Sequence, residues 1–413
     1  MHALDTSTCV LLLGGQENSL SIARNLGRQN IEVRVSGRKT CWASYSRFCK
    51  KAYTVPNDLD TKEYWYNLLL APDTVLLEGQ IIMACNDDAL EFVSTHQTAL
   101  QKRYILEEFD KNTHTALLDK QKTIEFAKQA GVPTPANWPI ETMEELEALR
   151  SKIPIPAIVK PLNSIEFRRK IGRKLLIATD NFDQLLDHAA RAFAANQKFM
   201  IVELIPGGDD KLCSYFTYLT PNGQFLFDYT KSVIRRYPIG YGGGSCHVTR
   251  WQPDAMEMGR KFLKSIDYHG MANIEFKRHG DQLKIIEINT RFAASHELIT
   301  RSGAPIDLIV YCHLTQQAIP TFDSYEQDLY LWAPVADTLA FLQLNRQKKM
   351  AFSNWIRDVF SHKLVFPIFQ ISDPLPFLKA IGTLVAKLQK LLYTRLKSRL
   401  SPSKSNKRHP GPA

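Results

Sequence analysis

The first hundred residues alternate between short apolar runs and an amphipathic stripe. Residues 9–13 are apolar, which predicts a strand, and Gly14 and Gly15 follow as a turn. Apolar residues recur at helical spacing over residues 20–26, and apolar and polar residues alternate over residues 31–35, which predicts a helix and then a second strand. Because units of strand, helix and strand build parallel sheets, we expect a parallel α/β sheet at the start of the chain.

The two glycines at the end of the first strand do not complete a dinucleotide-binding motif. The segment LGGQENS lacks the third glycine of GxGxxG, and SGRKT after the second strand lacks the acid that would hold a ribose. We therefore favour a Rossmann-like scaffold whose strand ends line a substrate cleft over a nicotinamide site. Residues 81–85 predict a further strand that leads into Asn86, Asp87 and Asp88. These three are secondary candidates, because open α/β sheets bind ligands at the carboxyl ends of strands.

After residue 117 the pattern becomes one of a capped helix followed by strands and turns. Asp119 as N-cap and Gly131 as C-terminal stop bound a short helix. Residues 199–210 predict a strand that ends in a proline–glycine turn. The basic residues 163–176 show little hydrophobic periodicity and predict a strand–loop–strand hairpin with a mobile tip, and the glycines of residues 240–244 predict a flexible loop.

Composition and charge narrow the classes of function. The chain has 413 residues, 44% of them hydrophobic, which is enough for about two or three domains with packed cores. Its 52 basic and 42 acidic residues give a formal net charge of +10, and nine positive charges follow Asp373, after which the sequence contains no acid. Residues 1–373 therefore carry only +1, and we expect no nucleic acid as a partner.

The seven cysteines are scattered and nowhere have CxxC spacing. This excludes a disulfide framework or a zinc knuckle and predicts reduced thiols. The apolar run before Gly14 is too short for a signal peptide, and no stretch approaches the roughly 18 apolar residues of a membrane span. We therefore expect a cytoplasmic protein, with the inner face of the membrane as a second location if the basic C-terminus binds lipid.

The most informative segment of the chain predicts a β-hairpin. Residues 271–277 and 283–289 both alternate between apolar and polar positions, and they flank a turn centred on Gly280. One face of this hairpin is expected to pack inward. That face carries Ile274, Phe276, Ile286 and Ile288.

The opposite face of the hairpin carries oxygen ligands. With the turn in this place, Glu275 is expected opposite Ile285 and diagonal to Glu287, and a period of two puts Glu275, Glu287 and Asn289 on one face. Two carboxylates and an amide suit a hard cation such as Mg²⁺. The alternative is an ordinary amphipathic hairpin with a solvated polar face, and hairpin spacing by itself favours that alternative.

Two lysines upstream favour the metal site over the ordinary amphipathic hairpin. Lys120 begins a helix and Lys160 ends an apolar strand, and a lysine is a point charge suited to a phosphate oxygen. Together with IVELIPGGDD and EINTR, they resemble the ATP-grasp superfamily of ligases over about residues 117–314. The motifs occur in the family's order at residues 118–120, 131–135, 159–161, 202–208, 274–277 and 287–291.

The resemblance implies a site for the phosphates of ATP. Lys120 and Lys160 would contact the α- and β-phosphates. Lys160 and Arg291 would be the catalytic residues, with Arg291 steadying the transferred phosphate and the acyl phosphate. One or two Mg²⁺ ions, or Mn²⁺ in their place, would bridge the β- and γ-phosphates. The implied metal ligands are Glu275, Glu287 and Asn289.

The resemblance also implies a site for the adenosine part of ATP. The segment formed by Glu203, Leu204 and Ile205 would contact adenine, chiefly through backbone groups. Asp210, or Asp209 if the register shifts by one, would take the ribose hydroxyls. Both assignments depend on the resemblance and not on the spacing of these residues.

Within the superfamily, the chain looks most similar to carboxylate–amine ligases that include D-aspartate ligase-like enzymes. The similarity lies in GGQENSLSIARNLGRQNIEV, KSVIRRYP and SDPLPF. In such enzymes the segment around Lys231, Arg235 and Arg236 faces the acceptor site, and a guanidinium there can hold a second carboxylate through two hydrogen bonds. For the two arginines, simple solvation at the surface is an equally open alternative.

Three features depart from the family's pattern. The loop over the phosphates, residues 163–174, contains only Gly172, so its closure would depend on arginines and lysines instead of backbone amides. Thr290 stands where a proline is usual. His296 falls near the expected cleft and could be an acid or a base, but we favour a packed or capping histidine.

The C-terminal part carries no chemical motif. Residues 319–376 are rich in aromatic residues and are expected to complete the core. Further on, apolar residues follow helical spacing, and Arg395 and Arg399 fall on the apolar side. This helix either packs as far as Leu392 or lies flat on an anionic bilayer, and the polar tail beyond it is expected to be disordered.

The predicted fold class is α/β and α+β. We expect a Rossmann-like pre-ATP-grasp domain over residues 1–112 and a two-lobed ATP-grasp core over residues 113–318. Residues 319–376 would complete that core. Residues 377–413 would form a C-terminal helical extension, which consists of a basic amphipathic helix and the disordered tail.

The predicted function is that of an ATP-dependent ligase that activates a carboxylate as an acyl phosphate and joins it to an amine, either an amino acid or a cell-envelope precursor. Its expected partners are ATP, a small carboxylate and a small amine. The alternative is a non-catalytic ATP-binding protein that residues 377–408 recruit to an anionic membrane. A nicotinamide oxidoreductase is a distant third, and the sequence is silent on oligomeric state.

Overall fold

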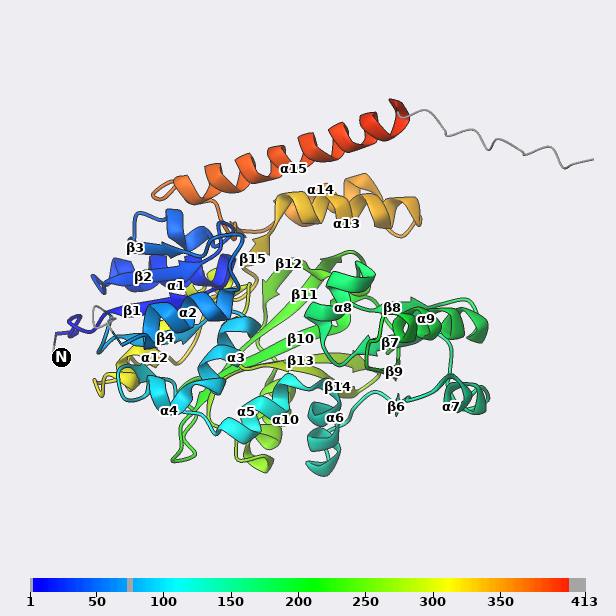
Figure 1. Ribbon diagram of the computed structural model, residues 1–413, viewed down its shortest axis with the longest axis horizontal. Coiled ribbons are helices and arrows are strands. Elements are labelled where there is room, and N and C mark those ends of the chain that lie inside the picture. The colour runs from blue at the N-terminus through cyan, green and yellow to red at the C-terminus, as the bar shows by residue number, and fades with distance from the viewer. Residues whose placement is uncertain (1–2, 73–76, 401–413) are drawn as a thin grey trace, which may run out of the picture.

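The computed structural model describes residues 3–72 and 77–400, and it is built around three β-sheets (Figure 1). In the view of Figure 1 the first sheet lies to the left, the smallest to the right and the largest between them, while the C-terminal helices cross the top. This arrangement confirms the predicted fold class: a Rossmann-like domain, a two-lobed core and a helical extension. The residue numbers at which these parts divide stay predictions.

The first sheet is parallel and has the strand order β3-β2-β1-β4-β5. Its middle strand, β1, is buried along its whole length, as expected for a parallel sheet that is covered on both faces. The expected Rossmann-like scaffold is therefore present. Its elements are β1 Val10–Leu13, α1 Glu17–Arg28, β2 Val33–Gly37, the 3₁₀ helix η1 Trp42–Tyr45, β3 Cys49–Thr54, α2 Thr61–Leu70, β4 Ile81–Ala84, α3 Asp87–Thr95, α4 Gln97–Leu100 and β5 Ile105–Leu106.

The smallest sheet is antiparallel, with the order β6-β9-β7-β8, and forms a separate lobe with its own hydrophobic core. Helix α6 leads into it and begins as expected, because the Asp119 side chain accepts hydrogen bonds from the backbone N–H groups of Gln121 and Lys122. The elements of this part are α5 Lys111–Leu118, α6 Lys120–Gln129, β6 Asn137–Pro139, α7 Met143–Ala148, β7 Ala157–Pro161, α8 Ser164–Ile171, β8 Leu176–Ala178, α9 Phe182–Ala194 and β9 Phe199–Glu203.

The expected hairpin in the basic segment of this lobe is wrong, because most of that segment forms helix α8. Asn163 accepts a hydrogen bond from the backbone N–H of Glu166, and Glu166 pairs with Lys170 one turn later at 2.8 Å. Phe167 is fully buried in the lobe's core. A helix that buries so few side chains shows little periodicity, whereas the capping contact and the ion pair favour the helical conformation.

The largest sheet has seven strands in the order β14-β13-β10-β11-β12-β15-β16, all antiparallel except for the last pair. It contains the predicted hairpin, and the glycine-rich segment joins two of its strands. Its strands and the neighbouring helices are η2 Asp209–Lys211, β10 Leu212–Leu219, β11 Tyr229–Tyr237, β12 Gly243–Thr249, α10 Pro253–Ser265, β13 Gly270–His279, β14 Gln282–Asn289, α11 His296–Arg301, α12 Ile306–Leu314, β15 Tyr330–Trp332 and β16 Leu364–Val365.

The register that we expected for the β13–β14 hairpin is wrong by two positions: the turn pairs His279 with Gln282, which shifts the pairing by one, and a β-bulge shifts it by one more. Phe276 pairs with Ile285 and Glu275 pairs with Glu287, so Ile286 is an extra residue between the two pairs. Ile285 is fully buried, whereas Ile286, which was expected in the core, is only half-buried. The bulge moves the second half of β14 by one position, which sets Glu287 directly opposite Glu275.

One continuous hydrophobic cluster joins the parallel sheet to the largest sheet. It includes Val10 of β1, Phe216 of β10, Tyr229 of β11 and Phe292 after β14. The ends of the parallel strands are therefore held against the same part of the molecule that carries the predicted hairpin. All seven cysteines are free thiols, as expected.

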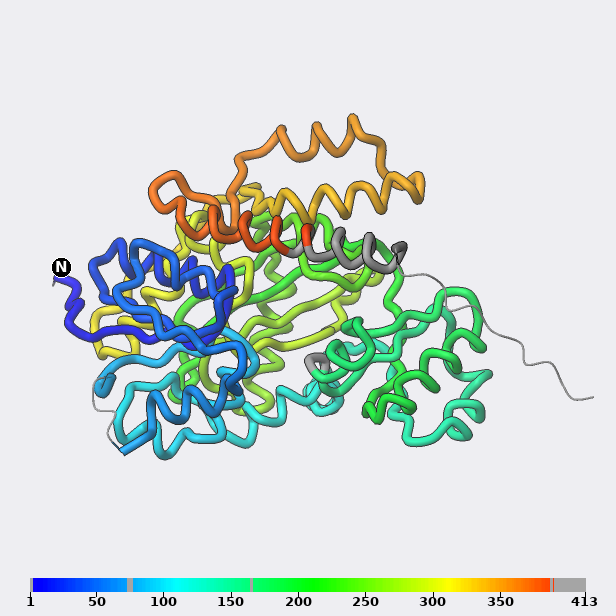
Figure 2. Tube along the Cα trace, turned by 45° about the horizontal axis from the view of Figure 1, so that its top comes forward, coloured from blue at the N-terminus to red at the C-terminus, as the bar shows by residue number. Residues whose placement is uncertain are grey.

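The C-terminal segment adds strands to the largest sheet and helices above it. Strands β15 and β16 extend the sheet, so residues 319–376 complete the core in part. Helices α13 Pro334–Arg346, α14 Phe352–Phe360 and α15 Leu375–Leu400 lie on one side of the molecule (Figures 1 and 2). The side chains of Arg395 and Arg399 and the tail after residue 400 lie outside the described part. Among the described residues, no helix is both long and apolar enough to cross a membrane.

Candidate functional site

A pair of carboxylates from the hairpin forms the centre of the candidate site. The bulge places Glu287 of β14 opposite Glu275 of β13, and the Asn289 side-chain amide donates a hydrogen bond to Glu275 Oε1 at 3.3 Å. The structure therefore brings together all three predicted metal ligands. It does so through direct pairing of the two glutamates instead of the diagonal arrangement that we expected.

Both predicted phosphate-binding lysines reach this pair from other elements. Lys120, the first residue of α6, places its Nζ 3.3 Å from Glu287 Oε1. Lys160, near the end of β7, donates from its Nζ to the backbone carbonyl oxygen of Ile286 at 3.0 Å. The bulge therefore has two effects, because it aligns the carboxylates and also presents the extra carbonyl group to Lys160.

The charges of the site shift the pKa values of its members. Burial lowers the pKa of the Lys160 ammonium to about 8, and the charge of Lys120 adds to this, while Glu287 and Glu275 oppose it. Burial by itself would raise the pKa of Glu287, but the positive charges of Lys120, Lys160 and Lys174 outweigh burial and lower it. Positive charge is thus concentrated around one carboxylate, which is an arrangement that attracts an anion.

The residues at the centre fit Mg²⁺. Glu275, Glu287 and Asn289 offer only oxygen donors as ligands, and the Lys120 ammonium already stands beside Glu287 where a cation is attracted. Mg²⁺ keeps several water ligands and is usually held by one or two carboxylates together with substrate phosphates. In the part of the chain that the structure describes, no group of three or more His, Cys, Asp or Glu side chains is placed to hold a metal, so this mixed set is the candidate.

Lys231, one of the predicted substrate residues, lies in line with the carboxylates across the sheet. Lys231 of β11 pairs with Ser214 of β10, which pairs with Glu275, which pairs with Glu287. The buried Lys231 Nζ lies 3.2 Å from Ser214 Oγ and 3.2 Å from His247 Nδ1. One row across four strands therefore joins an ammonium group to the predicted metal ligands.

Burial also sets the titration of Lys231 and its neighbour. It lowers the pKa of Lys231 to about 8, although Glu275 acts in the opposite direction. Burial and the charge of Lys231 lower the pKa of His247 well below its usual value. His247 is therefore neutral near pH 7 and can accept a hydrogen bond from the Lys231 ammonium at Nδ1. Sequence reasoning missed His247, since no motif marks it.

Arg235, also predicted to face the acceptor, is instead held within the protein. Its Nε and Nη2 donate to the two carboxylate oxygens of Asp337 at 2.7 and 3.0 Å, and its Nη1 pairs with Asp358. The indole N–H groups of Trp332 and Trp355 also donate to Asp337. Arg235 is nearly fully buried, so surface solvation, the alternative considered for it, is wrong. Both edges of its guanidinium already bind carboxylates, and its role toward the acceptor stays a prediction.

Arg236 contributes to the neighbouring loop and not to the carboxylate pair. It donates to Asp209 Oδ1 at 2.9 Å and to the backbone carbonyl of Gly240 at 2.6 Å. Of the two aspartates considered for the ribose, Asp209 is therefore bound by an arginine, whereas Asp210 is exposed and lies 3.6 Å from Lys211. Asp210 remains the predicted ribose ligand.

The predicted adenine segment is fixed between the two lobes. The backbone N–H of Glu203 donates to the Ala136 carbonyl at 2.8 Å, and its side chain binds Lys284 at 3.0 Å. The Leu204 N–H donates to the carbonyl of Pro156 at 3.3 Å. These contacts place the segment at the end of β9, as the motif predicts, while its role toward adenine stays a prediction.

Lys277 is a residue of this region that sequence reasoning missed. Its Nζ donates to the backbone carbonyls of Ile205 and Gly207 at 2.7 and 2.8 Å. It lies in the motif IEFK, two positions beyond Glu275, so the period of two already puts it on the face of the metal ligands. Its contacts tie the predicted adenine segment to the strand that carries Glu275.

Arg291 meets the N-terminal domain. Its Nε donates to Asp87 Oδ1 at 2.8 Å, and Asp87, the first residue of α3, is one of the three secondary candidates named at this strand end. The Asn18 side-chain amide donates to the carbonyls of Cys85 and Phe292, which links the same strand end to the residue after Arg291. The strand ends of the parallel sheet therefore border the candidate site.

His296 has the packed role that we favoured. Its side chain is fully buried, its Nε2 lies 3.2 Å from Asp307 Oδ2, and its ring packs edge-on against Phe292. The position lies inside the core, so the structure does not bring His296 to the carboxylate pair.

Comparisons with known proteins agree with this geometry. No family model matches the chain. A D-aspartate ligase from Enterococcus faecium is 24% identical over 299 residues, which cover 66% of this chain and 68% of that protein. The large chain of an arginine-specific carbamoyl phosphate synthase from Halalkalibacterium halodurans is 23% identical over 272 residues, which cover 62% of this chain and only 25% of that protein.

Solved structures with the same fold include a ligase, a carboxylase and a synthetase. An L-amino acid ligase from Bacillus licheniformis has a TM-score of 0.58 at 15% identity, with 76% of each chain covered. A biotin carboxylase from Campylobacter jejuni has a TM-score of 0.60 at 15% identity, with 79% of this chain and 75% of that chain covered. An N5-carboxyaminoimidazole ribonucleotide synthetase in complex with ADP has a TM-score of 0.58 at 10% identity, with 78% of this chain and 81% of that chain covered. The chain therefore shares the fold of these enzymes, and this fold agrees with the resemblance of its motifs to the ATP-grasp superfamily of ligases.

Proposed function

We propose that the protein is an ATP- and Mg²⁺-dependent ligase that phosphorylates a carboxylate and joins the resulting acyl group to an amine. The observation that carries this proposal is the meeting of Lys120 and Lys160 with the Glu275–Glu287 pair, at the end of a row that also contains Lys231. Phosphoryl transfer needs mainly positioned positive charge around anionic oxygens, and this arrangement supplies it.

In this proposal ATP lies against the lysines and the hairpin. Lys120 and Lys160 bind the α- and β-phosphates, and Glu275, Glu287 and Asn289 hold one or two Mg²⁺ ions. Bound Mg²⁺ would neutralise charge on the phosphate oxygens. The backbone of residues 203–205 contacts adenine and Asp210 binds the ribose.

The reaction has two steps. A carboxylate oxygen of the substrate attacks the γ-phosphorus, the bond between that phosphorus and the oxygen bridging to ADP breaks, and ADP leaves. Arg291 and Lys160 stabilise the negative charge on the phosphoryl oxygens in both steps. The amine then attacks the acyl carbon, phosphate leaves, and the new amide nitrogen loses a proton to solvent.

The proposed substrates are small amino acids and related carboxylates of the cytoplasm, or precursors of the cell envelope. Two proteins with a similar sequence or fold are named as a D-aspartate ligase and an L-amino acid ligase. Lys231 supports this class, because it is a buried ammonium in line with the metal ligands and suits a substrate carboxylate. Since Arg235 and Arg236 bind protein groups, we assign the acceptor contact to Lys231.

The test is release of ADP and phosphate across a panel of amino acids and other small carboxylates, singly and in pairs. A productive pair should stimulate release, and Glu287→Gln and Lys160→Met should each lower it by roughly 100-fold or more. Glu144→Gln and Lys152→Met make the same changes at exposed positions of the small lobe and should have no effect. Undiminished release in both site variants would contradict the assignment of the site.

The same panel separates the ligase from the non-catalytic alternative. A protein that only binds ATP would show nucleotide affinity in wild type and no stimulated product with any acceptor. The grouping of Lys120 and Lys160 with the carboxylate pair supports the ligase over this alternative.

A further inference from the structure

Exposed apolar side chains gather on the C-terminal helices. Fifteen large apolar side chains are exposed among the described residues, and twelve of them lie between residues 335 and 385. Monomeric proteins rarely leave apolar side chains so concentrated in one region without a partner. The twelve are Val335, Leu339, Leu342, Phe352, Phe360, Phe369, Ile371, Leu375, Leu378, Ile381, Leu384 and Val385.

Helix α15 turns its larger apolar residues away from the protein. Ala380 and Thr383 are partly covered, whereas Leu378, Ile381 and Leu384 are exposed at helical spacing. An amphipathic helix ordinarily buries its apolar stripe against the core. Among the described side chains of α15, Pro376 and Phe377 at its start and then Ala380 and Thr383 are the covered ones, so Leu378, Ile381 and Leu384 are left for something outside the chain.

Helix α13 shows the same pattern. Val335, Leu339 and Leu342 follow the spacing of i, i+4 and i+7 and are exposed, while Phe341 and Ala340 on the other side are buried. Figures 1 and 2 show α13, α14 and α15 on the same side of the molecule. We call the exposed apolar residues on this side of the molecule the α13–α15 surface.

The start of α15 is firmly attached to the N-terminal domain. Asp373, just before the helix, is buried and pairs with the fully buried Arg24 of α1 at 2.9 Å. The Ser46 hydroxyl and the Arg47 backbone N–H also donate to its carboxylate at 2.7 and 3.0 Å. This network holds the helix in one position, so the exposed stripe belongs to the folded protein.

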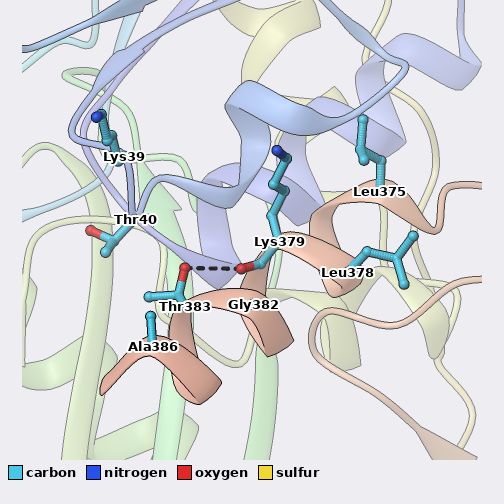
Figure 3. Close-up of a pocket in the computed structure, with 8 residues that line it drawn as sticks. All are labelled: Lys39, Thr40, Leu375, Leu378, Lys379, Gly382, Thr383 and Ala386. Atoms are coloured by element: carbon cyan, nitrogen blue, oxygen red, sulfur yellow. Dashed lines mark hydrogen bonds between the residues drawn. The ribbon is translucent and has the colours of Figure 1, made fainter. Parts of the chain in front are cut away.

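A groove runs between α15 and the loop after β2, with a volume of about 780 Å³ (Figure 3). Leu375 and Leu378 line it, and Lys39 and Lys379 stand on opposite walls. Figure 3 shows the two lysines extending in the same direction. A Cβ at Gly382 would meet no atom within 4 Å, so the groove is open along this part of the helix. An apolar floor with two ammonium groups suits an amphiphile that has an anionic head.

The sequence just after α13 and the sequence after Asp373 are basic, although α14 itself carries Asp358. After Asp373 the chain has nine basic residues and no acid, and three more bases, Arg346, Lys348 and Lys349, follow α13. The remainder of the chain is nearly neutral. Basic residues beside an exposed apolar stripe are the pattern of a segment that lies in the interface of an anionic bilayer.

We propose that the α13–α15 surface binds the interface of an anionic phospholipid bilayer. The exposed leucines, isoleucines and phenylalanines enter the boundary between headgroups and acyl chains, and the basic residues bind headgroup phosphates. The groove beside Lys39 and Lys379 takes part of one lipid. The membrane contact thus involves α13 and α14 as well as the basic C-terminus, and it is independent of the reaction proposed above.

The experiment is co-sedimentation of the full chain with vesicles of phosphatidylglycerol and phosphatidylcholine, compared with vesicles of phosphatidylcholine alone. Wild type should bind the anionic vesicles and be lost from them at high salt. The double variant Leu378→Asp with Ile381→Asp should reduce the partition coefficient of the protein onto the vesicles by about tenfold or more. Two apolar side chains that enter the bilayer in this proposal become charged. Val335→Asp with Leu342→Asp should do the same from α13.

A matched control uses two exposed apolar residues away from this surface. Leu59 and Tyr66 lie in the N-terminal domain and are exposed to a similar extent, so Leu59→Asp with Tyr66→Asp should leave vesicle binding unchanged. Lys39→Glu with Lys379→Glu should weaken binding and reduce its dependence on salt. All variants change exposed side chains, and equal thermal midpoints will show that each is folded.

Several results would overturn the proposal. The proposal is wrong if the wild-type protein does not sediment with anionic vesicles, or if it sediments equally with neutral ones. Equal binding by wild type and both apolar double variants would show that the surface is not the contact. If light scattering finds a dimer in wild type and a monomer in the apolar variants, while vesicles bind neither, a second copy of the chain is the occupant instead.

Discussion

The Lys160 ammonium is subject both to burial and to the charges of its neighbours in the site. Lys160 is buried beside Lys120. Burial is the larger cause, and the charge of Lys120 the smaller one, that lowers the pKa of its ammonium to about 8. An ammonium with a lowered pKa is protonated below about pH 8 and neutral above it. The charged form binds phosphate, so the affinity for ATP should follow this titration.

We therefore predict that ATP binding weakens as the pH rises through about 8. Titration calorimetry of the full chain with ATP and Mg²⁺ from about pH 6.5 to about pH 9.5 measures this. In Lys160→Arg the guanidinium stays charged throughout that range, so the weakening should be much smaller. An identical pH profile in wild type and Lys160→Arg would show that another group is responsible.

Arg235 supports the fold, and a substitution there should act on stability. Arg235→Ala leaves the Asp337 carboxylate buried without its main partner, which is expected to cost about 3 kcal/mol of unfolding free energy. Arg260→Ala breaks a more exposed pair with Asp228 and should cost only about 1 kcal/mol or less. Denaturant unfolding of the two variants compares them. A stable Arg235→Ala protein with a raised KM for the acceptor would return Arg235 to the substrate site.

At the level of elements, the β-bulge at Ile286 decides the geometry of the site. Counting by twos along the sequence predicts both strands and the face of the metal ligands, but it places the pairing next to the turn one position away from that observed. It also misses the bulge, because the extra residue is specified by distant groups: Lys160 binds the Ile286 carbonyl, and the Ile285 N–H donates to the Pro133 carbonyl. No local pattern in the hairpin contains that information.

Removing the bulge should lower the activity of the protein. Deletion of Ile286 would restore a regular ladder in which Glu287 still pairs with Glu275, but it would remove the carbonyl that accepts the hydrogen bond of Lys160. We therefore expect ADP formation to fall by at least about tenfold. Ile286→Ala keeps the backbone carbonyl that binds Lys160 and should retain most activity. If the deletion variant folds, by circular dichroism, and still forms ADP at the wild-type rate, the proposed role of the bulge is wrong.

Other elements show why part of the site could not be predicted from the sequence. Helix α8 was missed because it buries little and depends on a cap and an ion pair, whereas α6 was found because Asp119 and Gly131 mark its ends. The partners of Arg235 lie about 100 positions later in α13 and α14. Lys277, by contrast, shares its face with Glu275 by simple alternation and could have been named.

At the level of the whole molecule, the N-terminal domain completes the site. The sequence predicted its parallel sheet and the strand end, before Asn86, that borders the candidate site. It did not predict the contact between Asp87 and Arg291, because these residues lie about 200 positions apart. A common hydrophobic cluster and the Asn18 bridge hold the two parts together. Arg291 is therefore positioned from outside the core that carries it.

We predict that Asp87→Ala lowers kcat by about tenfold while ATP affinity stays close to that of wild type, because only the positioning of Arg291 changes. Glu91→Gln, on the next turn of α3, alters an exposed pair with Lys62 and serves as the control. Steady-state kinetics and nucleotide binding separate the two quantities. A loss of ATP affinity with unchanged kcat would place Asp87 in the nucleotide site instead.

The positive charges of the molecule fall into two groups, one in the core and one in the C-terminal extension. The described core places its positive charge at Lys120, Lys160 and Arg291, where phosphate is proposed to bind. The surplus of the whole sequence lies after Asp373, in the C-terminal extension. Catalysis and location are thus expected to depend on separate charges.

The central claim is that a substrate carboxylate attacks the γ-phosphate of ATP. Its most direct test labels both carboxylate oxygens of a stimulating substrate with heavy oxygen and follows the label by mass spectrometry of the released phosphate. The proposed reaction transfers one labelled oxygen to each phosphate, since the acyl oxygen leaves with phosphorus when the amine attacks. Release of ADP with unlabelled phosphate would show that water attacks ATP, and it would contradict the account.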